Sequence, residues 1–204
     1  MGRLSCSAYG AQMSYREISS TDIPGLHPVN LFSKFWFEGK RDALVPLRAA
    51  IEPTRIPAIL PWLLLLEVVM IDGQQQFRYR LTGTGCRDLF GIDYTGKLLG
   101  EDLTPDGAEA RKREFKKVVE NGNPIYSASH LPIAELNFVN VYRGVFPVSL
   151  NGNRIDQIFV AIAREDLLLE TSHPSARPHL QQSRLNTCRD ARGSVSACRS
   201  MTLP

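Results

Sequence analysis

The sequence predicts an α+β protein built on a five-stranded antiparallel sheet, and three observations lead to this prediction. Two strand-like segments, residues 63–71 and 77–82, are joined by an Asp-Gly turn. An amphipathic helix pattern follows over residues 104–120. Three further strand candidates span residues 125–131, 138–150 and 155–164. Two strands and three strands separated by a helical insert are typical of an α+β domain.

Length and charge indicate one folded domain with extensions. The chain has 204 residues, of which 43% are hydrophobic and 22% charged, as in ordinary globular proteins. Its net charge is +3, but residues 171–204 hold five Arg and one Asp, a charge of +4, which leaves −1 for residues 1–170. We therefore expect a flexible leader over residues 1–27, a domain over 28–167 and a disordered basic tail over 168–204.

Cysteine usage and the apolar runs suggest a cytoplasmic protein without a membrane partner. The four cysteines, at positions 6, 86, 188 and 198, show no Cys-x-x-Cys spacing, so we expect no metal site. The N-terminus has no apolar core typical of a secretory signal. The longest apolar run, residues 59–71, contains Pro61 and Glu67 and is too short to span a bilayer. Helix-turn-helix and RNA-binding strand motifs are absent, so we expect no nucleic-acid partner.

The first predicted element is a helix over residues 28–38. Leu31, Phe35 and Trp36 fall on one face of this flanking helix, and Gly39 is available as its C-terminal cap. The apolar face either packs on its own domain or contacts a second copy of the chain. We predict a homodimer in which these three side chains contribute, because exposed Phe and Trp would form a large apolar patch on a monomer.

The central elements follow from proline positions and from alternation. Residues 42–53 are expected to be extended, and Pro53 suits the first turn of a short helix that ends near Leu60. Residues 63–71 are apolar on both sides, as in a strand covered on both faces or a helix running into a strand. Alternation in the next strand places Phe77, Tyr79 and Leu81 on one side, facing the helices.

The long helix begins at a strong N-terminal signal. Thr104 is its predicted N-cap, Pro105 and Asp106 suit the first turn, and Asn121-Gly122 ends the helix. Its apolar face should place Phe115 and Val119 against the sheet. We interpret the basic residues between positions 111 and 117 as a solvated face, because three glutamates interleave with them.

Several spaced motifs resemble those of a bacterial PAS domain family, PAS_5. The resemblance covers residues 28–167 and rests on Phe35-Trp36, Pro46-x-Arg48-Ala49-x-Ile51-x-Pro53, Ile56-Pro57-x-x-Leu60-Pro61, Glu67-Val68, Phe77-Arg78-Tyr79-Arg80-Leu81-x-Gly83-Thr84, Leu89-Phe90-Gly91, Thr95-Gly96-Lys97 and Phe146-Pro147-Val148-Ser149. It implies a PAS-like sheet with helices packed on one face, the flanking helix at its N-terminal side, and a sensory or regulatory role.

We expect a ligand cavity between the sheet and these helices. The candidate pocket residues are Tyr79, Leu81, Cys86, Phe90, Phe115, Val119 and Tyr142. The candidate polar anchors are Arg78, Arg80, Glu67 and His130. Arg78 and Arg80 project together from a strand, and we favour a salt bridge to Glu67 over an anionic-ligand site.

Cofactor chemistry receives little support from the residues. Similarity to haem-binding PAS domains would require a His on the long helix, which has none, and His130 falls in a strand. Cys86 follows the second strand directly, unlike the cysteine of flavin photoreceptor PAS domains. We therefore interpret it as a buried apolar residue. The alternative is a reactive thiol whose pKa is lowered by the neighbouring Arg87. Haem and flavin are therefore disfavoured, and the cofactor, if there is one, is unknown.

The favoured function is a non-catalytic PAS-type module that binds a small ligand or a protein partner in signalling. Output would pass through protein contact, because the chain has no room for a kinase, cyclase or phosphodiesterase domain. Two alternatives stay open. One is a small enzyme on a curved-sheet α+β scaffold, which would need two or more polarised acid or base groups in its cavity. The other is a ligand-free interaction scaffold with a filled core.

Overall fold

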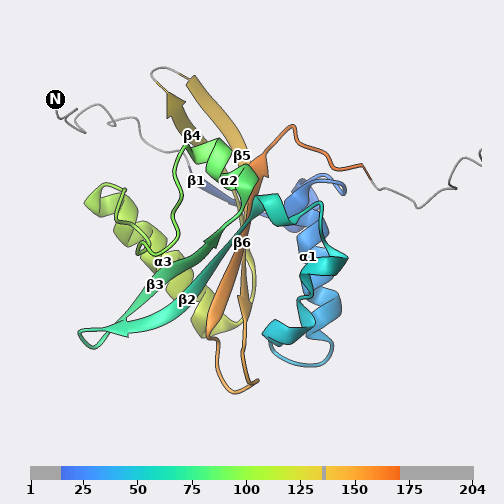
Figure 1. Cartoon of the computed structure of the whole chain (residues 1–204), viewed down its shortest axis with the longest axis vertical. Coiled ribbons are helices and arrows are strands. Elements are labelled where there is room, and N and C mark those ends of the chain that lie inside the picture. The colour runs from blue at the N-terminus through green and yellow to red at the C-terminus, as the bar shows by residue number, and fades with distance from the viewer. Residues whose placement is uncertain (1–14, 135–136, 171–204) are drawn as a thin grey trace, which may run out of the picture. The chain divides into compact units, whose positions relative to one another are not determined.

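A six-stranded antiparallel sheet organises the folded part of the chain (Figure 1). The computed structural model describes residues 15–134 and 137–170. The strands are β1 (Tyr15–Ile18), β2 (Leu63–Ile71), β3 (Gln74–Thr82), β4 (Ile125–Ala134), β5 (Asn137–Val148) and β6 (Gln157–Arg164), in the spatial order β1-β4-β5-β6-β2-β3. The predicted α+β class and the split of the strands around a helical insert are confirmed. The basic tail from residue 171 and the first fourteen residues lie outside the described part.

In the described part of the chain, three α-helices and four 3₁₀ turns accompany the sheet. They are α1 (Pro28–Lys40), α2 (Thr84–Phe90), α3 (Pro105–Asn121), η1 (Ser20–Asp22), η2 (Arg48–Ala50), η3 (Pro53–Arg55) and η4 (Leu60–Trp62). The short helix predicted after Pro53 is instead two separate 3₁₀ turns. Pro57 has no backbone N–H to donate to the carbonyl of residue 53, so the turn that begins at Pro53 cannot continue as a helix.

The sixth strand corrects the expectation of a leader that is flexible up to residue 27. Residues Tyr15–Ile18 pair with β4 in antiparallel register, from Tyr15 opposite Ser129 to Ile18 opposite Tyr126. Such a strand satisfies backbone groups that would otherwise stand unpaired along the edge of β4. Four residues with two charges among them carry too little alternation to predict this strand from the sequence.

Helices cover both faces of the sheet: α2 and α3 pack on one face, and the flanking helix α1 covers the other. We call these faces the α1 face and the α3 face after the helix that packs on each; Figure 1 shows α1 and α3 on opposite sides of the strands. α1 packs on β5 and β6, while α3 contacts β5 and α2 contacts β6. Each face has its own apolar core, one centred on Phe32, Trp36 and Phe146 and the other on Phe77, Phe115 and Val145.

A β-bulge in the β2–β3 hairpin changes which side of the sheet one predicted core residue occupies. Leu66 lies opposite Tyr79, but Leu65 lies opposite Leu81, so Arg80 is an extra residue in β3. Such an insertion shifts the alternation of side chains by one. Phe77 and Tyr79 face α3 as predicted, whereas Leu81 joins Leu65 on the α1 face and is 48% exposed. The prediction that Leu81 faces the helices with Phe77 was therefore wrong.

The turn between these strands is tighter than predicted. β3 begins at Gln74, which leaves only Asp72 and Gly73 between the strands. Both residues have positive φ, 51° and 74°, as a two-residue type I′ turn requires. The Asp-Gly pair therefore sets the register from which β2 and β3 extend.

The flanking helix packs on the sheet of its own chain. Phe35 and Trp36 are buried, and the Trp36 indole N–H donates to the carbonyl of Pro147 at 2.8 Å. Gly144 on β5 permits this approach, because a Cβ there would lie only 2.9 Å from Val29. Phe35 and Trp36 are thus not free to contact a second copy, contrary to their predicted role, while Leu31 is half-buried. A homodimer stays a prediction that would have to use other residues.

The N-terminal end of α1 is fixed by a side chain that the sequence pattern did not identify. His27 is its buried N-cap: Nδ1 accepts the Val29 N–H at 3.2 Å, and Nε2 lies 2.9 Å from the carbonyl oxygen of Arg164. Burial lowers the pKa of this imidazole, which keeps it neutral and able to accept. Gly39 lies inside the helix and not at its cap, because the helix continues to Lys40 and Arg41 is the C-cap residue.

Replacement of Trp36 tests the intramolecular role of α1. We expect Trp36→Ala to lower the free energy of unfolding by about 3–5 kcal/mol, because a large buried side chain is lost and the Pro147 carbonyl loses its donor. Phe37→Ala is the control, since Phe37 is 51% exposed on the same helix, and it should cost less than about 1 kcal/mol. Urea titration followed by circular dichroism measures both. Equal losses for the two variants would contradict this packing.

Candidate functional site: an apolar groove on the α1 face

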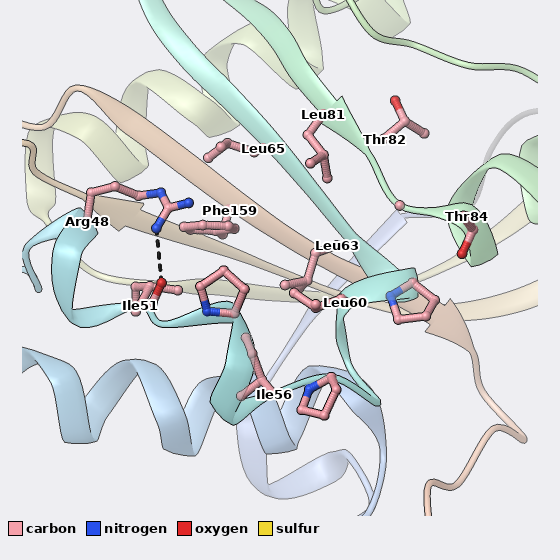
Figure 2. A pocket seen from close by; sticks show the side chains of 14 residues that line it. Arg48, Ile51, Ile56, Leu60, Leu63, Leu65, Leu81, Thr82, Thr84 and Phe159 are labelled. Carbon is pink, nitrogen blue, oxygen red and sulfur yellow. Dashed lines mark hydrogen bonds between the residues drawn. The ribbon is translucent and has the colours of Figure 1, made fainter.

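A groove of about 400 Å³ opens on the α1 face beside the core of that face (Figure 2). It is bounded by the edge of the sheet and by the segment that connects α1 to β2. Its lining residues are Arg48, Ile51, Pro53, Ile56, Pro57, Leu60, Pro61, Leu63, Leu65, Leu81, Thr82, Gly83, Thr84 and Phe159. Its volume falls within the range of about 300–1,000 Å³ that is usual for small-molecule sites.

Three neighbouring strands provide the floor of the groove. Phe159 on β6 lies opposite Leu65 on β2, and Leu65 lies opposite Leu81 on β3. Directly opposed residues on one sheet face have adjacent side chains, so these three form a continuous apolar row across the strands. The bulge at Arg80 completes the row, because without it Leu81 would face α3. The floor therefore depends on one inserted residue.

The proline-rich segment from Ile51 to Pro61 forms the wall. Ile56 and Ile59 are buried in the α1-face core and hold the segment against the sheet. At the end of β3 the backbone of this segment lies directly on Gly83, where a Cβ would come within 2.4 Å of the Pro61 carbonyl oxygen. A side chain at position 83 would therefore push the wall away from the strand.

One charged side chain lines the groove. The Arg48 guanidinium lies 5.2 Å above the ring of Phe159, and its Nη1 donates to the carbonyl of Ile51 at 3.0 Å, as Figure 2 shows. Arg48 forms no ion pair with any side chain in the described part of the chain. The remaining polar side chains of the lining, Thr82 and Thr84, lie at the opposite end.

The predicted pocket residues are divided between the two faces. Leu81 is the one that lines this groove. Phe115, Val119, Tyr79, Phe90 and Cys86 pack in the α3-face core, where the rings of Phe77 and Phe115 lie 5.2 Å apart. Tyr142 packs at the edge of the α1-face core and donates to Glu165 at 2.8 Å. The sequence prediction therefore placed the pocket on the face that the structure fills with α2 and α3.

Cys86 has the environment of a buried apolar residue. Its side chain is fully buried, and burial raises the pKa of the thiol to about 12. A thiol with so high a pKa forms little thiolate near neutral pH, so it is a poor nucleophile. This environment supports the interpretation of Cys86 as a packing residue and disfavours the reactive-thiol alternative.

The predicted polar anchors form a salt bridge on the α1 face. Glu67 lies 3.5 Å from Arg78 and 3.6 Å from Arg80, so the predicted pairing is confirmed. These arginines are partly exposed, so the pairs contribute at most about 1 kcal/mol. His130 is exposed on β4, where its ring bonds to Asn140, and it does not line the groove.

Sequence reasoning missed Arg48, although the residue stands within one of the quoted motifs. The sequence predicts that residues 42–53, which include Arg48, are extended, and it indicates no partner for this side chain. An arginine surrounded by Pro, Leu, Ala and Ile residues is itself a signal, because a charge among apolar neighbours needs a compensating group. Only the structure shows that Phe159, more than a hundred positions away, lies beneath it.

A second charged cluster lies beneath α3. Glu114 pairs with Arg143 of β5 and, at 3.0 Å, with Arg111, and all three side chains are largely buried. Tyr15 of β1 donates to Glu114 at 3.2 Å, and burial followed by the Glu114 charge raises its pKa to about 12. Arg111 and Glu114 were predicted to lie on a solvated face, which was wrong. Arg143 points into the α3 face and attracts the acid inward.

The comparisons with known proteins give one match. A family model described as PAS_5, a PAS domain, matches residues 26–134. No curated protein and no solved structure matches the chain. Within the described part, no three His, Cys, Asp or Glu side chains are grouped to hold a metal ion. None of the described helices combines the length and the apolar character that crossing a membrane would require.

The buried cluster predicts an acid-sensitive stability. Burial alone would raise the pKa of Glu114, but Arg143 and Arg111 outweigh it and hold the pKa below its usual value. The carboxylate therefore stabilises the fold above its unfolded pKa of about 4.3, and this contribution is lost as the pH falls through the folded pKa. Glu114→Gln should lower the free energy of unfolding by about 3–5 kcal/mol at neutral pH. It should also weaken the loss of stability as the pH falls.

Glu109→Gln is the matched control, because Glu109 is exposed on the same helix and forms no ion pair with the described residues. It should leave the unfolding free energy within about 0.5 kcal/mol of the parent. Urea titrations at pH 7 and at several lower pH values measure both variants. If Glu114→Gln retained the parent's acid sensitivity, the assignment of that sensitivity to Glu114 would be wrong.

Proposed function

The chain belongs to the PAS_5 family of PAS domains, and from this premise we propose that it acts as a non-catalytic sensory or regulatory module. PAS domains are generally non-catalytic sensory modules. We propose further that its input is a small ligand in the groove on the α1 face, and that its output is a contact with a protein partner. A cytoplasmic location and the absence of membrane and nucleic-acid partners belong to the same proposal.

The observation that carries the proposal is the chemistry of the groove lining. Ten of the lining residues named above have hydrocarbon side chains, and one cation lies at one end. Concave apolar sites with a few placed polar groups are typical of small-molecule binding. The lining contains no carboxyl, imidazole or thiol group, so a binding role fits it better than general acid–base catalysis.

The groove is in direct contact with the core that holds α1. Ile51, Ile56, Leu63 and Phe159 line the groove and also belong to that core. The ring of Phe159 lies 5.4 Å from the ring of Phe32 on α1, so one side chain separates a bound ligand from the helix. A ligand that shifts Phe159 would change the packing of α1 and the surface that α1 presents.

The exposed side of α1 is a suitable place for output. Phe37 is 51% exposed there, beside charged residues such as Glu38 and Lys34. A second copy of the chain or another protein could contact this side without disturbing Phe35 and Trp36. The affinity of such a partner would depend on how α1 packs on the sheet. Ligand binding would then be coupled to protein contact through the packing of this helix.

Native mass spectrometry of the protein purified from its own host tests the proposal. We expect the wild type to carry a small molecule, and Leu81→Trp to lose it, because an indole on the groove floor would occupy the site. Met70→Trp is the control, since Met70 is 67% exposed on β2 and does not line the groove. Hydrogen exchange at α1 should slow in the loaded protein.

Two results would contradict the proposal. The ligand-free scaffold would be favoured if the wild type carries no small molecule and if Leu81→Trp does not change hydrogen exchange at α1. A bound molecule that is chemically converted during incubation would favour the small enzyme instead.

A further inference from the structure

We infer that the groove on the α1 face binds a monocarboxylate with an apolar body, whose carboxylate pairs with Arg48. This inference rests on the proposed binding role of the groove and specifies the class of ligand. It follows from three features of the described residues: the unpaired charge of Arg48, the single cation in the lining, and the uninterrupted hydrocarbon surface between Arg48 and the threonines.

Among residues 15–134 and 137–170, Arg48 has no acidic partner, whereas a closely similar arginine has one. Arg55, seven residues later, also stacks over a phenylalanine, with its Cζ 4.9 Å from the Phe35 ring centroid, and it pairs with Glu38 at 3.6 Å. Arg48 has the same stacking, 5.2 Å from Phe159, but in place of a carboxylate it has only the Ile51 carbonyl. Two N–H groups of a guanidinium match the two oxygens of a carboxylate, and Arg48 uses one donor on the backbone.

The lining fits one negative charge and not two. Arg48 is the sole cation among the lining residues, and Arg78 and Arg80 are already paired with Glu67 further along the same face. A second carboxylate elsewhere in the groove would lie against leucine, isoleucine and proline side chains, where an unpaired charge is strongly disfavoured. A phosphate monoester, with nearly two negative charges, is disfavoured for the same reason.

The rest of the ligand should be hydrocarbon. From Arg48 the floor passes over Phe159, Leu65 and Leu81, and the wall opposite presents Ile56 and Leu60 (Figure 2). A chain or ring that extends from the carboxylate along this row would exchange water for apolar contact over its whole length. Each methylene added within the groove should tighten binding about fourfold, which corresponds to the usual gain per buried methylene.

Titration calorimetry on the full chain tests the inference with four probes that each contain eight carbon atoms: octanoate, octanamide, octylammonium and octyl phosphate. Octanoate should bind at least about tenfold more tightly than octanamide, because the pair with Arg48 is charge-assisted. Hexanoate should bind more weakly than octanoate by about fifteenfold, for two methylenes. Octylammonium and octyl phosphate should bind more weakly than octanoate.

Two variants locate the site. Arg48→Met keeps an unbranched side chain over Phe159 and should reduce octanoate binding to the level of octanamide. Arg55→Met is the matched control and should leave octanoate affinity within about twofold of the parent. Leu81→Trp leaves Arg48 in place and should abolish binding of octanoate and octanamide alike. Circular dichroism shows whether Arg48→Met folds. If it does not fold, Leu81→Trp still tests whether the probes bind in the groove.

The outcomes separate this inference from the function that it refines. Any one of three results would overturn the carboxylate assignment. They are equal affinity for octanoate and octanamide, tighter binding of octylammonium or octyl phosphate than of octanoate, and full octanoate binding by Arg48→Met. If the probes fail but the natively purified protein carries a small molecule that Leu81→Trp excludes, the ligand class is wrong while the binding role stands. If neither probes nor native protein show a ligand in the groove, both fail.

Discussion

The central strands β2, β5 and β6 carry apolar side chains on both faces, so each face of the sheet has to be covered. This constraint accounts for most of the architecture. On one face α2 and α3 close over Phe77 and Val145; on the other, α1 closes over Phe146 and Phe159. The groove lies where the cover of the second face is incomplete. There a proline-rich segment stands in place of a helix and leaves the row from Phe159 to Leu81 partly open.

Buried charges in this fold lie where a group of opposite charge can pair with them. Arg143 projects from β5 beneath α3, and Glu114 turns inward to meet it although its helix is rich in basic residues. β1 is held to the same cluster by Tyr15, so the ion pairs connect a helix, a central strand and an edge strand. Arg48 differs from Arg143 in this respect. It stacks on an aromatic ring at the mouth of the groove and pairs with no acid among the described residues, and this contrast underlies the ligand class inferred for the groove.

Sequence patterns predicted the elements whose signals are local. The Thr104-Pro105 start and the Gly122 end of α3, the Asp72-Gly73 turn and the five strands from β2 to β6 follow from capping, turn chemistry and alternation. The ion pairs of Glu67 were also predictable, because opposite charges on neighbouring strands define their own partners once the hairpin is recognised. The candidate groove was predicted far less well, since Leu81 alone of the proposed pocket residues lines it.

The sequence by itself determined the fold family, the strand pairs around the helical insert and the apolar character of both sheet faces, because each depends on residues close together in the chain. Tertiary structure alone decided which face holds the groove. The extra residue at Arg80 turned Leu81 away from α3, and a bulge depends on how two strands fit under their covers. It also decided that Trp36 packs inward and that Arg48 meets Phe159. These contacts join segments separated by more than a hundred residues, and no local pattern encodes them.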